Sequence, residues 1–323
     1  MINCLIKTAQ ELKMIQGLPD AQDDGQIIWL EITAPTVDEA TILRSHFGIE
    51  VAVQRNSVME TDDLLYLRTD LLRLTEDGTP QFGRIHFILG EHWVATLSHN
   101  ADFQPFNQVI ARLRKKSRNH QNPRAVLRVL LRAANDMADN SLDHITDALE
   151  CLSEHIFEIS EGYSADGREL GVKDLLKIMR RLNEKEELIS RCLESQLSLA
   201  RAVRYLSGEV DSLIHPELEE LVNELAADVT GVKEHAYFEH EKVRYLQNAV
   251  TNILNIKQNQ IVKIFTIITA VFLPPTLVGT FYGMNFSVMP ELSWKYGFIY
   301  SMILTVAAAL LPLIYIKRKG WLR

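Results

Sequence analysis

Two apolar segments without any charged residue lie near the end of this chain. Residues 264–282 and 296–316 contain no Asp, Glu, Lys or Arg. A helix rises about 1.5 Å per residue and the hydrocarbon layer is about 30 Å thick, so about 20 apolar residues cross it. Both segments are of that length, and both lie too far from residue 1 to be a secretory signal peptide. The pattern predicts two membrane-spanning helices joined by a short loop, residues 283–295.

Flanking cations predict the orientation of this hairpin. Lys257 and Lys263 precede the first span, and Lys317, Arg318, Lys319 and Arg323 follow the second. The loop between the spans contains one cation and one anion, Lys295 and Glu291. Lys and Arg beside spans are retained on the cytoplasmic side, so we expect both termini and the residues before the first span there. The widely spaced Cys4, Cys151 and Cys192 form no disulfide framework or zinc spacing, which agrees with a reducing compartment.

The net charge of −8 argues against nucleic acid as a partner. One basic segment, residues 112–132, surrounds the apolar positions Val126, Leu127, Leu130 and Leu131. We interpret it as a solvated helix face or a junction between elements, with contact to a membrane surface or an anion as the alternative.

The residues before the spans divide into an α/β part and a helical part. Residues 1–120 contain strand-like runs and one helix signal, from Pro35 to Gly48, and predict a mixed α/β domain. The strand-like runs are 26–32, 51–54, 64–74, 82–89 and 93–97. Residues 121–215 are helical, with breaks at 162–171 and near 208–216. The fold class is therefore α+β, followed by a long helix and the hairpin.

The long helix is predicted over residues 216–282, so that it continues into the first span. No proline occurs between Glu217 and Leu273, a stretch that would make a rod of about 85 Å. So long a rod must pack against other helices or other subunits. Pro274-Pro275 predicts a kink inside the span. The second span, 296–316, is followed by a basic tail, 317–323.

Polar and apolar side chains recur on one face of the first span. The positions three or four apart are Asn259, Val262, Phe265 or Thr266, Thr269, Leu273, Thr276 and Thr280. Such a stripe has two interpretations. In a lone hairpin it packs one helix against another. Repeated around a symmetry axis, it lines a pore with polar rings and apolar constrictions.

The chemistry of the spans favours a hydrated ion. Neither span contains a carboxylate or histidine, which a proton relay or a dehydrating metal site needs. Mg²⁺ holds its water tightly, and neutral oxygens such as those of Asn285, Thr276 and Asn259 can contact its hydration shell. The glycines at 162 and 167 are followed by Arg168-Glu169 and form no phosphate-binding loop. We therefore expect no ATP-driven step, no enzyme activity and no cofactor.

Acidic groups before the first span are weaker metal candidates. Glu224 and Asp228 belong to a charged stretch that a solvated helix face explains. His235 and Glu239 are four residues apart, but two ligands are too few for a typical zinc site.

Five blocks near the end of the chain resemble the CorA family of magnesium and cobalt transporters, in its proteobacterial branch. The blocks are NIKQNQIVKIF (255–265), FLPPTLV (272–278), YGMNF (282–286), MPELSW (289–294) and KRKGWL (317–322). The earlier part of the chain resembles the family in its layout and in Trp29-Leu30-Glu31. The resemblance implies a homopentameric funnel in the bacterial inner membrane that conducts Mg²⁺ and Co²⁺, and possible residue roles follow from matching positions.

The implied selectivity filter is Gly283, Met284 and Asn285, with Glu291 as the acidic residue of the external loop. Thr276 and Asn259 would form inner polar rings, and Leu273, Phe265 and Val262 an apolar gate. Mg²⁺ would be the substrate and also a regulatory ligand, at Glu224 and Asp228.

Two positions depart from the family pattern. Ser287 occupies a loop position that is often Glu in relatives, and Phe265 replaces a smaller aliphatic residue. Two other functions remain open: Zn²⁺ transport by a related branch, and a membrane-tethered sensor or scaffold whose hairpin is only an anchor. Ion preference among Mg²⁺, Co²⁺, Ni²⁺ and Zn²⁺ does not follow from the sequence.

Overall fold

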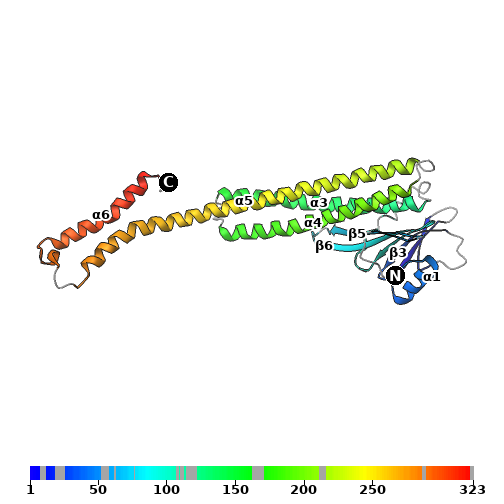
Figure 1. Cartoon of the computed structure of the whole chain (residues 1–323), viewed down its shortest axis with the longest axis horizontal. Helices are drawn as coiled ribbons and strands as arrows, with labels where there is room; N and C mark the ends of the chain where they lie inside the picture. Colours follow the sequence, from blue (N-terminus) through cyan, green and yellow to red (C-terminus); the bar gives the residue numbers. More distant parts are fainter. Residues whose placement is uncertain are drawn as a thin grey trace.

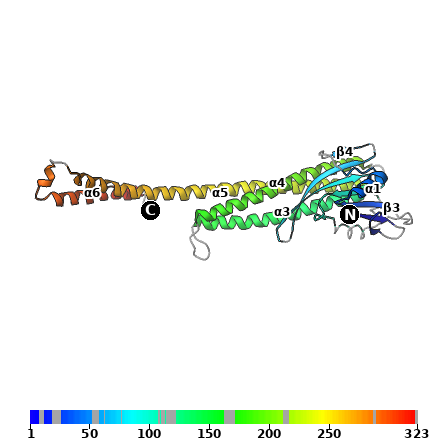
Figure 2. The same ribbon diagram turned by 90° about the horizontal axis from the view of Figure 1, so that it is seen from below.

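The molecule is elongated, with a sheet at one end and a helical hairpin at the other (Figure 1). The computed structural model describes residues 1–7, 12–18, 26–51, 58–61, 63–75, 77–106, 109, 113, 122–161, 171–210, 216–285 and 289–320. Three long helices lie along the sheet, and one of them continues alone to the hairpin (Figures 1 and 2). The expected α+β domain, long helix and hairpin are therefore all present.

The described strands form a seven-stranded mixed sheet in the order β2-β1-β3-β7-β6-β5-β4. The strands are β1 (Ile2–Lys7), β2 (Leu12–Gln16), β3 (Gln26–Thr33), β4 (Val58–Glu60), β5 (Leu65–Leu74), β6 (Pro80–Leu89) and β7 (Val94–Ser98). β3 and β7 pair in parallel and the other neighbours pair antiparallel. β1, β2 and β4 were not expected. Of the expected run 51–54, Val51 is a bend and the rest lies outside the described residues.

The centre of the sheet is covered on both faces, which explains the nearly continuous apolar sequence of β3. Trp29 lies in the apolar cluster shared with the long helices, and its indole nitrogen donates to Thr96 Oγ1 at 3.0 Å. The next residue, Leu30, lies in the cluster on the opposite face, together with Leu43 of α1. The sheet is thus the middle of three layers.

Helix α1 (Val37–Phe47) begins and ends where local chemistry predicts. Thr36 and Glu39 form a capping box, in which each side chain accepts a hydrogen bond from the other residue's backbone N–H. Gly48 ends the helix with φ 68°, a left-handed conformation that favours glycine. Pro35 therefore precedes the cap and is not the first helical residue.

Three long helices pack lengthwise as a bundle against the other face of the sheet. They are α3 (Pro123–Glu161), α4 (Val172–Glu209) and α5 (Pro216–Tyr282). Their contacts include fully buried Leu127, Leu199 and Leu225 near the sheet and Leu149, Leu182 and Val243 further along. The bundle lets α5 bury an apolar face, as expected for a rod of this length.

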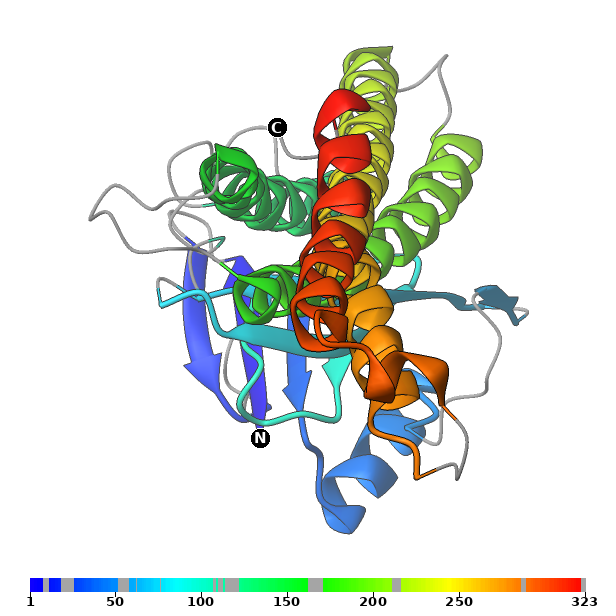
Figure 3. The same ribbon diagram turned by 90° about the vertical axis from the view of Figure 1, so that its left-hand side faces the viewer.

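Beyond the bundle, α5 continues alone into the hairpin. Val250 is its last buried residue in the described chain. After the short helix η1 (Pro290–Ser293), α6 (Gly297–Arg318) turns back along α5 toward the bundle (Figures 1 and 3). Because α6 turns back toward the bundle, the end of α6 at Arg318 lies on the same side of the hairpin loop as the sheet.

Candidate ion pathway

The apolar helices of the hairpin are almost uncovered within the chain. The most apolar 18-residue window is 0% buried in α5 and 6% buried in α6. A core helix of a soluble protein would be mostly buried, whereas here rings such as Phe272 (67% exposed) and Phe298 (77%) project outward. Lipid or another subunit must cover them, so the hairpin comprises two membrane spans.

The predicted stripe occupies one face of α5, and that face points away from α6. At 100° per residue the seven positions fall within about 120° of the helix circumference. All seven are exposed: Asn259, Val262, Phe265, Thr269, Leu273, Thr276 and Thr280. The half-buried residues lie on the opposite face, and α6 packs on this part of α5: Lys263, Ile267, Ala270, Val271, Pro274, Pro275, Val278 and Tyr282. The stripe is therefore not the packing surface of the hairpin.

Each threonine of the stripe donates its hydroxyl hydrogen to the helix backbone. Thr269 Oγ1 donates to the Phe265 carbonyl at 2.9 Å, and Thr276 Oγ1 to the Phe272 carbonyl at 2.7 Å. Thr280 Oγ1 lies 2.8 Å from the Leu277 carbonyl and 3.0 Å from that of Thr276. A hydroxyl has one hydrogen and two lone pairs. Because the hydrogen is used within the helix, each threonine presents only hydrogen-bond acceptors on the exposed side of α5.

The prolines and the stripe lie on opposite sides of α5. Proline lacks the N–H of the helical hydrogen bond, and its ring bends a helix away from itself. The face opposite Pro274 and Pro275 carries a groove of about 480 Å³, and Thr269, Leu273, Thr276 and Thr280 are among its lining residues. The groove therefore lies on the face that carries the stripe.

The Gly-Met-Asn segment closes α5. The Gly283 N–H donates to the Gly279 carbonyl at 3.0 Å, and the Met284 N–H donates to the Phe281 carbonyl at 3.3 Å. A Cβ on Gly283 would lie 3.2 Å from the Gly279 carbonyl oxygen, closer than is usual, so glycine suits this tight ending. The next residue, Asn285, is exposed.

Two predicted loop residues have no described side chain. Ser287 lies outside the described residues. Glu291 belongs to η1, and its side chain likewise lies outside the described part. Their roles stay predictions.

Glu224 and Asp228 lie in ion pairs within the chain. Arg132 of α3 approaches Glu224 Oε1 at 3.4 Å and Asp228 Oδ2 at 3.5 Å, and Arg128 lies 3.8 Å from Glu224. Burial, and then the neighbouring Arg132, lower the pKa of Arg128. A third arginine, Arg124, pairs with Glu209 at 3.2 Å. The described end of the basic segment is therefore a junction between helices, as interpreted, and the metal role of the two carboxylates stays a prediction.

Sequence reasoning missed one group of side chains of a type that can bind metals, between α3 and α5. Asp139, Asp143 and His235 each bring a ligand atom within 4.8 Å of the others. The spacing of four between the aspartates was visible in the sequence, but their distance from His235 depends on how α3 and α5 pack.

The fold and the stripe define a class of two-span membrane proteins. In this class a long helix extends from a large domain outside the membrane into the membrane, where one polar face of the helix is uncovered. The chain belongs to the family described as CorA-like Mg²⁺ transporter protein, whose model matches residues 24–318. This is a family of transporters and not of enzymes. The chain is therefore a membrane protein of the Mg²⁺ transporter class.

Individual relatives agree with this assignment. The chain is 29% identical to the magnesium transport protein CorA of Haemophilus influenzae, over all of both chains. The complete structure of the CorA magnesium transporter from Methanocaldococcus jannaschii has the same fold, with a TM-score of 0.77, 18% identity and 99% of each chain covered. The ZntB cytoplasmic domain from Vibrio parahaemolyticus is less similar, with a TM-score of 0.56 and 11% identity over 78% of this chain and 97% of that one.

Proposed function

We propose that the chain is the subunit of a homopentameric channel that admits Mg²⁺, and also Co²⁺ and Ni²⁺, through a pore lined by α5. The observation that carries the proposal is the uncovered stripe. Its hydroxyl and amide groups alternate with apolar side chains on the face opposite α6. A lone hairpin would leave these polar groups toward lipid, whereas a ring of subunits would enclose them.

Recognition of the ion would rest on acceptors that contact its hydration shell. The waters around Mg²⁺ point hydrogens outward, and Mg²⁺ gives up water reluctantly. The Asn285 amide oxygen would form the outer ring, with Gly283 and Met284 ending the helix beneath it. Deeper rings would come from Thr276 and Asn259. Because the threonine hydrogen bonds are already made to the backbone, the lone pairs are free to accept from these waters.

The membrane potential would supply the driving force. It contributes about 2.3 kcal/mol per charge per 100 mV, and hence about 4.6 kcal/mol for a divalent ion. This corresponds to a concentration ratio of about three powers of ten. Inward movement would therefore need no ATP, and the orientation that the flanking cations predict, with both termini in the cytoplasm, places Asn285 at the outer mouth.

Closure would combine an apolar constriction with a cytosolic sensor. Val262, Phe265 and Leu273 are exposed on the stripe and would form the gate by excluding water. Intracellular Mg²⁺ would bind Glu224 and Asp228. Since both carboxylates already face Arg132, binding there would have to compete with these ion pairs.

The first prediction tests the outer ring. Asn285→Ala should reduce Mg²⁺ flux into proteoliposomes to background, because the amide acceptors are lost while the helices are unchanged. The matched control is Asn140→Ala, at an exposed position on α3. Unaltered flux through the Asn285 variant would refute its role. Repeating the assay over a range of internal Mg²⁺ tests feedback, which predicts falling flux as internal Mg²⁺ rises.

Zn²⁺ transport is the competing function, and its structural support is the likeness to the ZntB domain. That likeness concerns the fold alone, and the complete CorA structure matches the chain better. Parallel flux measurements with Zn²⁺ and Mg²⁺, with and without a pH gradient, separate the two. Preferential Zn²⁺ flux coupled to protons would overturn the Mg²⁺ proposal, and no flux of either ion would favour a tethered scaffold.

A further inference from the structure

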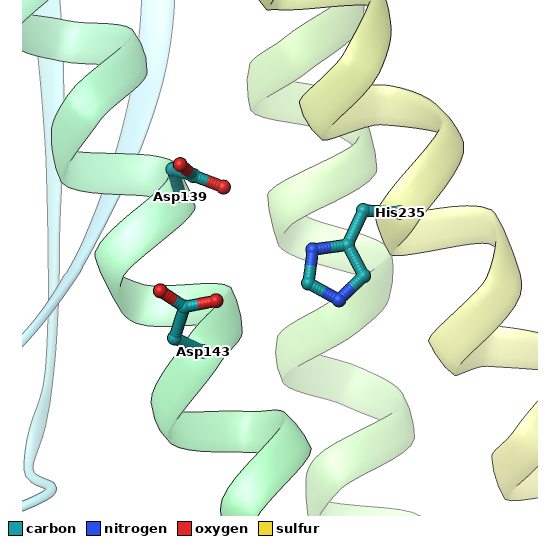
Figure 4. A group of neighbouring side chains, drawn as sticks. All are labelled: Asp139, Asp143 and His235. Carbon is teal, nitrogen blue, oxygen red and sulfur yellow. The ribbon is translucent and has the colours of Figure 1, made fainter.

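Far from the ion pathway, three side chains of metal-binding type meet between α3 and α5. Asp139 and Asp143 lie on successive turns of α3, and His235 extends from α5 toward them (Figure 4). One ligand atom from each lies within 4.8 Å of the other two. Asp143 is exposed and His235 half-buried, so an ion can reach the group from solvent.

The two ring nitrogens of His235 have different surroundings. Nε2 lies 3.9 Å from Glu239 Oε1 and 3.5 Å from Thr146 Oγ1. Nδ1 is the ring nitrogen on the side of the aspartates in Figure 4. A proton on Nε2, held toward Glu239 and Thr146, leaves the lone pair of Nδ1 directed toward the carboxylates.

Glu239 provides an independent indication of a metal site. This carboxylate is only 1% exposed, and among the described residues its Oε2 has no hydrogen-bond partner, with Lys242 Nζ 3.7 Å away. A histidine that binds a metal usually donates its other N–H to a carboxylate, which fixes the ring and raises its basicity. Glu239 stands behind His235 in this arrangement.

We propose that Asp139, Asp143 and His235 bind a first-row transition ion, Zn²⁺ or Co²⁺, within a single chain, and that Glu239 positions the imidazole. Imidazole suits these ions, whereas Mg²⁺ prefers oxygen ligands and keeps its waters. Three protein ligands with water in the remaining position is an established arrangement for Zn²⁺. The site shares no residue with the ion pathway or with Glu224 and Asp228, and it does not depend on the proposed function.

The geometry requires a small adjustment. Ligands about 2.1 Å from Zn²⁺ stand about 3.4 Å apart in a tetrahedral site, so the group must close by roughly 1 Å. Asp143 is exposed, so its side chain has room to rotate toward the other two ligands. Charge favours it as well: burial, and then the nearby Asp143, raise the pKa of Asp139, so a cation there relieves repulsion between the carboxylates.

Equilibrium dialysis of the full chain, purified in detergent without a histidine tag, tests the site directly. Zn²⁺ or Co²⁺ is titrated in the presence of millimolar Mg²⁺, which occupies sites built from oxygen. We expect His235→Asn to bind one ion per chain fewer than the native chain. The matched control is His240→Asn, on the same helix, where the ring lies 3.8 Å from Glu186 and belongs to no group of three metal-binding side chains in the described part of the chain. That variant should keep the full stoichiometry.

Two further variants distinguish a ligand from a structural residue. Glu239→Gln should keep the stoichiometry and weaken affinity by about 10–100-fold, as expected for a residue that orients a ligand. Asp139→Asn with Asp143→Asn removes two ligands from the surface of α3, and this variant should also bind one ion per chain fewer. It tests the site even if His235→Asn fails to fold. Equal binding by the native chain and folded His235→Asn overturns the proposal. Mg²⁺ that displaces the bound Zn²⁺ at equal concentration overturns it as well.

Discussion

The threonine hydroxyls of α5 show how one residue type can serve both the helix and an ion. Each donates to a carbonyl of the preceding turn and keeps its lone pairs outward. A hydroxyl in the membrane thereby avoids an unsatisfied hydrogen, and it still offers an acceptor to the water around a cation. The role of these groups depends on which way the helix face points.

Replacing a single hydroxyl tests this role. Thr276→Val keeps the shape of the side chain and removes its oxygen. One lost hydrogen bond is worth about 1 kcal/mol, so we expect roughly fivefold slower Mg²⁺ flux. Thr305→Val is the control, since Thr305 of α6 also donates to a carbonyl, that of Ser301 at 2.7 Å, but lies off the stripe. Equal losses in both variants would contradict a specific role for Thr276.

His86 predicts how the sheet domain responds to acid. The residue is 3% exposed, and no described residue forms a hydrogen bond with its Nδ1. Burial, and then the nearby His99, Arg68 and Arg84, lower the pKa of His86 to about 4. The neutral ring is therefore favoured in the folded state. This contribution to stability is present above the unfolded pKa of about 6.5 and is lost as the pH falls toward 4, by at most about 3 kcal/mol.

Thermal unfolding of the full chain in detergent measures this loss. We expect the melting temperature of the native chain to fall between pH 7 and pH 4.5 more steeply than that of His86→Leu. His92→Leu is the control, because the His92 side chain is 70% exposed. Its melting temperature should follow the native pH dependence. Parallel curves for the native chain and His86→Leu would show that His86 does not titrate in this range.

At the scale of elements, the shape of α5 depends on its two prolines. Proline inside a helix costs about 3 kcal/mol relative to alanine, so the pair at 274–275 is unfavourable for the helix alone. A bend away from the prolines, as expected at such a pair, would open the groove on the face with Thr276 and Leu273. If the groove provides room for a hydrated ion, the cost has a functional reason.

Straightening α5 should therefore improve the helix and impair transport. We expect Pro274→Ala with Pro275→Ala to raise the melting temperature and to lower Mg²⁺ flux several-fold. Pro312→Ala is the control, because Pro312 lies inside α6 and not on the stripe. Its flux should stay near the native value. Native flux in the double variant would show that the bend is not needed for conduction.

At the scale of the whole molecule, the hairpin is incomplete as a single chain. Its apolar windows are almost fully uncovered, and the polar stripe faces away from α6, which packs on the same part of α5. Copies arranged with their stripes toward a common axis would enclose the polar groups and leave α6 toward lipid. This arrangement makes a prediction that a monomer does not.

Cysteine cross-linking tests the arrangement. In a variant with Cys4→Ala, Cys151→Ser and Cys192→Ala, Thr276→Cys should form intersubunit disulfides on mild oxidation, because neighbouring stripes meet at the axis. A non-reducing gel should then show cross-linked species. Leu311→Cys, at a 68% exposed position of α6, is the control and should remain monomeric. Absence of cross-links in flux-competent Thr276→Cys would contradict a central pore lined by α5.

Local patterns predicted much of the fold. Uncharged length identified the two spans, the capping signals at 35–48 located α1 to within two residues, and the absence of proline predicted the long helix. β1, β2 and β4 were missed because charged residues interrupt or border these short strands and pairing with neighbours holds them in the sheet. Strand pairing joins residues far apart in the chain, which local propensity does not record.

For the candidate sites, too, one part could be predicted from the sequence and another part could not. The stripe follows from helical spacing, so the sequence by itself determined which residues share a face of α5. Two interpretations of that face remained, because spacing does not say what lies opposite. Only the tertiary structure answers that question, because the half-buried residues of α5, where α6 packs, lie on the other face. The same is true of His235, which meets Asp139 and Asp143 because packing of the bundle sets α3 beside α5, and no local rule specifies that contact.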